Sequence, residues 1–262
     1  FVNNTSLKEM IDFSRDEIKV RSSILSEAIL TNLDDQQILI DCLIKVVKKV
    51  STRMHDSKMK QTHRAIISFS RLQRILNKKS PTYKQTLISF FEEVKNLIST
   101  RNDPYFWLQY AIASLSFKDY ELADTYFRNA YSYADRKGGF DTFQIDNHYA
   151  RHILESEIYI GEVSTCMQQF AKAHEILTRK SNNDGRHYPI RVAKNYELFY
   201  QRFFKELIPS DKNIFLKSCQ EILFKIEDYK KINDRIFQKD VLDCEQSLTK
   251  IVLQEAAFQI RR

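Results

Sequence analysis

Glycine and proline are scarce in this sequence, which has only four of each in 262 residues. A protein built from β-sheets needs many tight turns, and tight turns consume both residues. The hydrophobic fraction of 43% and the aromatic fraction of 12% are those of a folded globular chain rather than a disordered one. We therefore expect long helices joined by few loops, and an all-α fold.

Paired cysteines and long apolar runs are also missing. The four scattered cysteines include no CxxC pair, which argues against a zinc ribbon or a disulfide framework. No apolar run approaches the ~20 residues of a membrane span, and the opening residues, FVNNTSLKEM, do not read as a signal peptide. We expect reduced core thiols in a cytoplasmic protein at Cys42, Cys166, Cys219 and Cys244. Since the chain begins at Phe1, we also expect it to be a piece of a longer polypeptide.

Motifs of the common catalytic sites are absent from the sequence. Its glycines form neither GxGxxG nor GxxxxGK, so no glycine-rich loop can bring backbone amides close to a phosphate. There is no GxSxG elbow for a serine nucleophile. We therefore assign no catalytic, cofactor-binding or metal-binding residue to this segment, and expect no cofactor in it.

Capping signals and apolar spacing predict about ten helices. Ser6 and Glu9 form a capping box that opens a helix expected to extend to about residue 32. The pairs Ser80-Pro81 and Asp103-Pro104 each place an N-cap residue before a proline of the first helical turn. The other helices are expected at about 34–54, 60–76 and 80–100, in two segments between 104 and 138, and at about 145–160, 163–179, 190–207, 211–229 and 240–261.

Small and aromatic residues alternate regularly between residues 103 and 143. Two helical faces result, one with Trp107, Tyr110, Ala111 and Ser114 and the other with Ala123, Phe127, Ala130 and Ala134. Small residues where two helix axes approach, with rings beside them, permit tight antiparallel packing. The pattern resembles a tetratricopeptide repeat, a helical hairpin of about 34 residues, although Lys118 replaces the turn glycine and the closing proline is absent.

The resemblance implies a tetratricopeptide-like α-solenoid or an irregular array of helical hairpins. Phe170 and Ala173 repeat the spacing of Phe127 and Ala130 at an offset of 43 residues, so the array is irregular. We expect three regions in one continuous array: residues 1–102 with a basic hairpin, 103–182 with the tetratricopeptide-like hairpins, and 183–262 with the C-terminal helices.

Two histidines one helical turn apart, His148 and His152, could share a metal ion with Asp146 and Glu155 as oxygen ligands. The interpretation that we favour is two imidazoles that form hydrogen bonds at a helix surface. Both alternatives stay open at the level of sequence.

A basic hairpin accounts for the net charge of +7, because residues 41–80 hold eleven Lys or Arg and only two acidic residues. Such a face could bind phosphates, with an affinity that falls steeply as salt is added. A charge-rich helix face is also common on proteins that bind no nucleic acid. The candidate residues for this alternative function are Lys45, Lys48, Lys49, Arg53, Lys58, Lys60 and Arg64.

A second candidate surface lies on the helix that begins at residue 104. Tyr105, Leu108, Ile112 and Leu115 lie off the Trp107 face, on the side that lines the concave groove of tetratricopeptide hairpins. Exposed apolar residues there would bind a peptide or a protein partner. The alternative is that neighbouring helices cover them.

The run from residue 103 to about 155 resembles the C-terminal helical region of large bacterial antiviral NTPases of the STAND type, including forms fused to a sirtuin-like NAD-cleaving domain. The similarity rests on FWLQYA, A-x-x-x-F-x-x-A-Y and FDTFQIDNHYAR. It implies a sensor or scaffold role for this segment, with NTPase or NADase activity elsewhere in the full-length protein. It also implies partner-binding or buried anchoring roles for Asp141, Gln144, Asn147 and Arg151.

From these features we expect a non-catalytic sensor or scaffold segment of a bacterial defence protein in the cytoplasm. Its partners would be a viral trigger protein or another protein, together with attached nucleotide-binding and effector domains. Self-association into a homo-oligomer and nucleic-acid binding are left open, and no membrane partner is expected.

Overall fold

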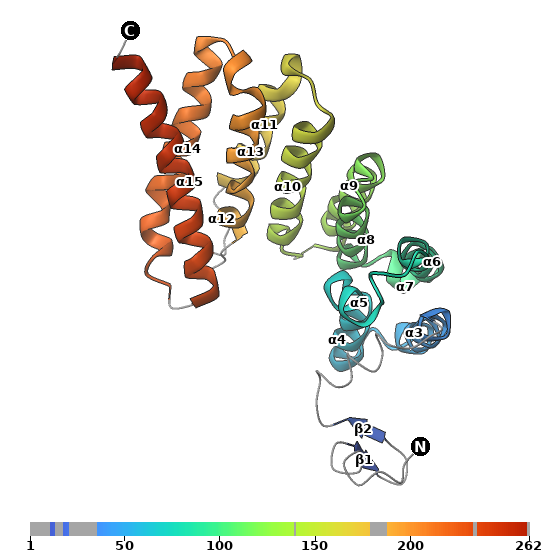
Figure 1. Cartoon of the computed structure of the whole chain (residues 1–262). Coiled ribbons are helices and arrows are strands. Elements are labelled where there is room, and N and C mark those ends of the chain that lie inside the picture. The colour runs from blue at the N-terminus through green and yellow to red at the C-terminus, as the bar shows by residue number, and fades with distance from the viewer. Residues whose placement is uncertain are drawn as a thin grey trace. The chain divides into compact units, whose positions relative to one another are not determined.

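The computed structural model describes residues 11–13, 18–20, 36–138, 140–178, 188–232 and 235–260 (Figure 1). Two compact units, residues 1–117 and 118–262, make up the chain, and each is described by itself. Their boundary falls within the expected 103–182 region, between the two helices of the tetratricopeptide-like hairpin. The all-α class is confirmed apart from one short pair of strands, whereas a solenoid arrangement stays a prediction.

The first unit contains the two strands, β1 (Ile11–Phe13) and β2 (Ile18–Val20), which pair antiparallel with Ile11 opposite Val20. The helix expected over residues 6–32 is therefore wrong at these positions. Apolar and polar residues alternate with a period of two in both triplets, a strand pattern, and the four residues between them suit a hairpin connection. The rest of that expected helix lies outside the described residues.

The helices of the first unit are α3 (Gln36–Ser51), α4 (Ser57–Ile66), α5 (Phe69–Ile75), α6 (Tyr83–Lys95), α7 (Ile98–Arg101) and α8 (Pro104–Ser116). The single helix expected over 60–76 is divided, because the backbone at Ser68 is extended and Ser68 becomes the N-cap position of α5. The amide of Phe69 is satisfied by a distant side chain, donating to Gln109 Oε1 at 2.9 Å. A tertiary hydrogen bond therefore stabilises the break.

The N-cap of α8 is Asp103, as the sequence predicts. Its carboxylate accepts from the Tyr105 amide at 3.4 Å, and the guanidinium of Arg64 donates to both carboxylate oxygens at 3.0 and 3.2 Å. Asp103 is 1% exposed. A buried carboxylate needs such partners, because an unpaired buried charge is costly.

Replacing Asp103 with Ala should destabilise the first unit by about 3 kcal/mol, since it removes a cap and leaves the Arg64 guanidinium unpaired. The measurement is urea unfolding followed by the fluorescence of Trp107, the only tryptophan. Asp103→Asn keeps a capping side chain without the charge, so it should lower the free energy of unfolding by less than Asp103→Ala does. An Asp103→Ala variant within about 0.5 kcal/mol of the wild type would contradict this role.

The second unit contains α9 (Tyr120–Lys137), α10 (Phe143–Ile160), α11 (Val163–Thr178), α12 (Tyr188–Ala193), α13 (Asn195–Phe203), a 3-10 turn η1 (Phe204–Glu206), α14 (Pro209–Tyr229) and α15 (Arg235–Ile260). Helix α9 stops at Gly138, whose φ of +62° suits glycine. Helix α10 packs against α9 and α11, and α14 packs against α15 (Figure 1). None of the helices in the described residues has the length and apolar character needed to cross a membrane.

Aromatic rings form the core of the second unit. The ring of Phe170 on α11 lies 4.8 Å from those of Tyr196 and Phe199 on α13, and 5.0 Å from that of Phe215 on α14. All four side chains are fully buried. This cluster joins α11 to α13 and α14 and thereby fixes α11 within the unit.

The thiols differ in burial. Cys166, Cys219 and Cys244 are free and buried, as expected, but Cys42 is exposed on α3, so its assignment to the core is wrong. Burial raises the pKa of Cys166 to about 11 and that of Cys244 to about 12. These two thiols therefore stay protonated at neutral pH and act as apolar packing groups.

Candidate functional site

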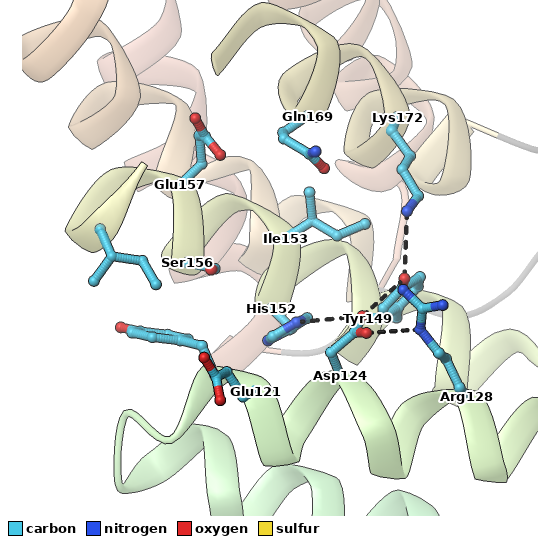
Figure 2. Close-up of a pocket in the computed structure, with 12 residues that line it drawn as sticks. Glu121, Asp124, Arg128, Tyr149, His152, Ile153, Ser156, Glu157, Gln169 and Lys172 are labelled. Carbon is cyan, nitrogen blue, oxygen red and sulfur yellow. Dashed lines mark hydrogen bonds and ion pairs between the residues drawn. The ribbon is translucent and has the colours of Figure 1, made fainter. Parts of the chain in front are cut away.

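A groove of about 430 Å³ lies over α9, α10 and α11 in the second unit (Figure 2). Its size is within the range of small ligand sites. We call it the α9–α11 groove. Its lining residues are Tyr120, Glu121, Asp124, Arg128, Tyr149, His152, Ile153, Ser156, Glu157, Ile160, Gln169 and Lys172.

Helical spacing places these residues on three facing stripes. Helix α10 contributes every third or fourth residue from Tyr149 to Ile160, and such residues share one face of a helix. Helix α9 supplies Glu121, Asp124 and Arg128 at the same spacing, and α11 supplies residues 169 and 172. Since α10 packs against both neighbours, the stripes meet in one groove.

A chain of polar contacts forms one end of the groove. The Arg128 Nε donates to Asp124 Oδ2 at 2.6 Å, and the Tyr149 hydroxyl donates to Asp124 Oδ1 at 3.2 Å. Lys172 Nζ in turn donates to the Tyr149 hydroxyl at 3.3 Å and lies 5.3 Å from the centre of its ring. Two cations are thus held at this end by one carboxylate and one phenol (Figure 2).

The floor of the groove contains His152, which is 4% exposed. Its ring stacks on that of Tyr149 at 5.9 Å and lies 5.5 Å from that of Phe127. Burial lowers the pKa of His152 to about 4, despite the opposing effect of Asp124, whose Oδ1 is 3.8 Å from Nε2. The imidazole is therefore neutral at pH 7, and within the described residues its Nδ1 has no hydrogen-bond partner.

Carboxylates occupy the other end. Glu157 is buried and accepts a hydrogen bond from Thr165 Oγ1 at 3.0 Å. A Cβ on Gly161 would lie 2.7 Å from the backbone carbonyl oxygen of Glu157 and would also crowd its carboxylate, so the close approach favours glycine at that position. Arg202 from α13 donates hydrogen bonds to the backbone carbonyls of Ile158 and Gly161, which lack helical partners at the C-terminal end of α10. Glu157 therefore lies buried at the acidic end of the groove, with one hydrogen bond to its carboxylate.

The metal site considered for His148 and His152 is not formed. In the part of the chain that the structure describes, no group of three or more ligating side chains is close enough to hold an ion. The Asp146 carboxylate accepts from the hydroxyls of Tyr131 and Thr142, and Glu155 pairs with Arg151. Burial lowers the pKa of His148, like that of His152, to about 4.

The candidate surface on α8 is only partly exposed. Leu108 and Leu115 are 1% and 2% exposed, so the expectation that they line an open surface is wrong. Tyr105 and Ile112 are half-buried, and the Tyr105 ring lies 5.2 Å from the Arg64 guanidinium carbon. Helix α8 packs against α5 and α7, and the sequence pattern alone could not tell which of its faces would be covered.

The residues from the FDTFQIDNHYAR motif serve local structure. Asp141 accepts from the Phe143 amide at 3.0 Å, and buried Asn147 donates to the Phe143 carbonyl at 2.8 Å. Arg151 donates to Glu155 at 2.6 Å, and Gln144 is half-buried. None of the four lines the α9–α11 groove. Asn147 fits the anchoring alternative, and partner binding by the others stays a prediction.

The basic hairpin is exposed at five of its seven candidate positions, namely Lys45, Lys48, Lys49, Arg53 and Lys58. Lys60 is half-buried. Arg64 is already bonded to Asp103, so its assignment to a free phosphate-binding face is wrong. The nearest acid to Lys48 is Glu93, whose Oε2 lies 3.9 Å from Nζ.

Sequence reasoning missed most of the groove. Glu121, Asp124 and Arg128 do have the spacing of one helix face, but a charged stripe is also typical of a solvated helix. Nothing local links them to Tyr149 or Lys172, which lie 25 and 48 residues beyond Asp124. No known protein family, characterised protein or solved structure matches the chain.

Proposed function

We propose that this chain is a non-catalytic recognition module that binds a segment of a protein partner in the α9–α11 groove. The observation that carries the proposal is a groove with an aromatic floor and charged edges. Peptide-binding sites combine apolar contact area with a few placed polar groups in this way. Arg128 is 72% exposed, and only its Nε is hydrogen-bonded to Asp124, which leaves the outer guanidinium nitrogens for a ligand.

The properties of His152 favour binding over acid–base chemistry. A general acid or base works best when its pKa is near the working pH, whereas burial holds the pKa of His152 at about 4. Its Nδ1 is buried, and so is the hydroxyl of Tyr120, which also has no hydrogen-bond partner in the described part of the chain. Neither atom is accessible from the groove, so His152 Nδ1 is not placed to exchange a proton with a ligand.

The biological setting that we propose follows from the resemblance of residues 103–155 to the helical region of bacterial antiviral NTPases. A viral trigger protein would bind this segment in the cytoplasm, and attached nucleotide-binding and effector domains would respond. A trigger can shift such an equilibrium only by its differential affinity for the two states. Full-length protein with a blocked groove should therefore fail to protect a bacterial host against phage.

The test of the groove is a selection from a library of random displayed peptides against the 262-residue chain, with binding sites mapped by amide chemical shifts. We expect shifts in α9, α10 and α11. Ser156→Trp, a partly exposed position in the groove, should block the site and weaken the selected peptides by about tenfold or more. Ser164→Trp introduces the same ring at an exposed position of α11 outside the groove and should change nothing.

The groove proposal fails if no selected peptide shifts these amides, or if both tryptophan variants bind equally well. Far-UV circular dichroism of the two variants checks that each remains folded. Because the two changes are chemically identical, a difference in affinity reports position alone.

Nucleic-acid binding by the first unit is the second candidate function, since five basic side chains are exposed on α3, α4 and the turn between them. We expect the triple variant Lys45→Ala, Lys48→Ala and Lys49→Ala to bind duplex DNA less tightly and with a flatter salt dependence. Each lost phosphate contact lowers the slope of log K against log salt by about 0.9. The measurement is fluorescence anisotropy from low to physiological salt.

The matched control for this experiment is the pair Lys217→Ala and Lys250→Ala, which removes exposed charge from the second unit. It should leave the slope unchanged. Absence of binding by the wild type at low salt would rule out this function.

A further inference from the structure

Apart from Asp124, which is bonded to Arg128 and Tyr149 at the basic end, the charges of the α9–α11 groove are sorted by sign along its length. Figure 2 shows Glu121, Ser156 and Glu157 on one side of His152 and Ile153, and Arg128 and Lys172 on the other. The same sorting follows from the helices. Glu121 is in the first turn of α9 and Arg128 lies two turns later, while Glu157 is near the C-terminal end of α10 and Tyr149 is two turns before it.

The helical rise sets the separation of the two ends. Glu121 and Arg128 are seven residues apart in α9, and a rise of 1.5 Å per residue places them about 10 Å apart along the axis. Tyr149 and Glu157 are eight residues apart in α10, or about 12 Å. An extended peptide covers this distance in three or four residues, at about 3.3 Å per residue. Because successive side chains point to opposite faces, only residues four apart would both face the groove.

Both ends have unused hydrogen-bonding capacity. At the basic end, Lys172 is exposed and has one hydrogen bond, to the Tyr149 hydroxyl. Of the Arg128 guanidinium, only Nε is bonded to another described residue. At the acidic end, the exposed Glu121 carboxylate has no partner among the described residues, and Glu157 accepts one hydrogen bond, from Thr165. An ion at either end would thus find free partners of opposite charge.

We propose that the α9–α11 groove recognises an extended protein segment that carries both an acidic and a basic side chain, four residues apart. The acidic side chain binds Arg128 and Lys172, and the basic one binds Glu121 and Glu157. An apolar side chain between them packs on Ile153 and the ring face of His152. The inference deepens the proposed function of the groove and rests on it.

Peptides with like charges at both ends would meet repulsion at one end of the groove, which gives the site its selectivity. Peptides with only one charge would use half of the site. A partner is therefore distinguished by the pairing of opposite charges at a defined spacing, and its net charge matters little.

The experiment is the library selection repeated with three proteins: wild type, Lys172→Glu and Glu121→Lys. Wild-type protein should enrich peptides with one acidic and one basic residue four positions apart around a central apolar residue. Lys172→Glu should shift the enrichment to two basic residues, and Glu121→Lys to two acidic ones. Synthetic versions of the winning peptides should each bind about fivefold more weakly to the variant of mismatched charge, the effect of one exposed ion pair.

Lys217→Glu, a charge reversal at an exposed position of α14, is the matched control and should select the wild-type peptides. Selected peptides that map to the groove but show no charge pairing, or the same pairing in all three proteins, would overturn this inference and leave the groove as a binding site. Failure of any peptide to shift groove amides would overturn the proposed function as well.

Discussion

Replacing Phe170 with Ala should destabilise the second unit by about 3–5 kcal/mol, the usual effect of truncating a fully buried phenylalanine. The ring contacts Tyr196, Phe199 and Phe215 on two other helices. Its removal therefore leaves a cavity where three helices meet, and the surrounding rings can close it only in part. The measurement is urea unfolding followed by far-UV circular dichroism.

The control is another phenylalanine in the same unit. Phe224 on α14 is 83% exposed, so Phe224→Ala should change the free energy of unfolding by less than about 0.5 kcal/mol. Similar losses for the two variants would mean that the aromatic cluster does not hold the unit together. The comparison is direct, because the same atoms are deleted in both.

Acid should destabilise the protein well before its carboxylates are protonated. Burial lowers the pKa of His152 to about 4 from about 6.5 in an unfolded chain. Between these values the unfolded state binds a proton that the folded state does not, so stability falls as the pH falls. His152 alone should contribute about 1.4 kcal/mol per pH unit over this window, and burial shifts the pKa of His63 and His148 in the same direction.

The pH prediction is checked by urea unfolding at several values between pH 7.5 and 4.5, in the wild type and in His152→Phe. The phenylalanine ring keeps the aromatic stacking with Tyr149 and Phe127 but binds no proton. In the variant, the slope of the free energy of unfolding against pH should be smaller by an amount that corresponds to close to one proton. An unchanged slope would mean that His152 titrates normally in the folded protein.

The binding and stability experiments support one another. The α9–α11 groove depends on the position of α11, which the Phe170 cluster fixes. It also depends on α10, where Arg202 donates a hydrogen bond to a backbone carbonyl at the C-terminal end of the helix. Loss of peptide binding in a groove variant is informative only if these supports are intact. The exposed groove residues Glu121 and Lys172 are therefore better test positions than buried His152.

Several local features of the chain were predictable because they depend on neighbouring residues, although the helix start expected at Ser80-Pro81 is wrong, since α6 begins at Tyr83 with Thr82 as its N-cap. The N-cap at Asp103 and the helix stop at Gly138 are confirmed, since capping and positive φ involve only a few adjacent residues. The expected helix is replaced by strands at residues 11–13 and 18–20, where the alternating apolar and polar pattern was better evidence than the capping box upstream.

Tertiary contacts decided everything that concerns function. The sequence by itself determined a helical chain with a concentrated basic hairpin and no glycine-rich phosphate loop. Only the folded structure paired Arg64 with Asp103, buried Leu108 and Leu115, and brought Asp124, Tyr149 and Lys172 together. The physical reason is that helical periodicity defines the faces of each helix, whereas the packing of helices distant in sequence determines which faces are covered and which remain open to a partner.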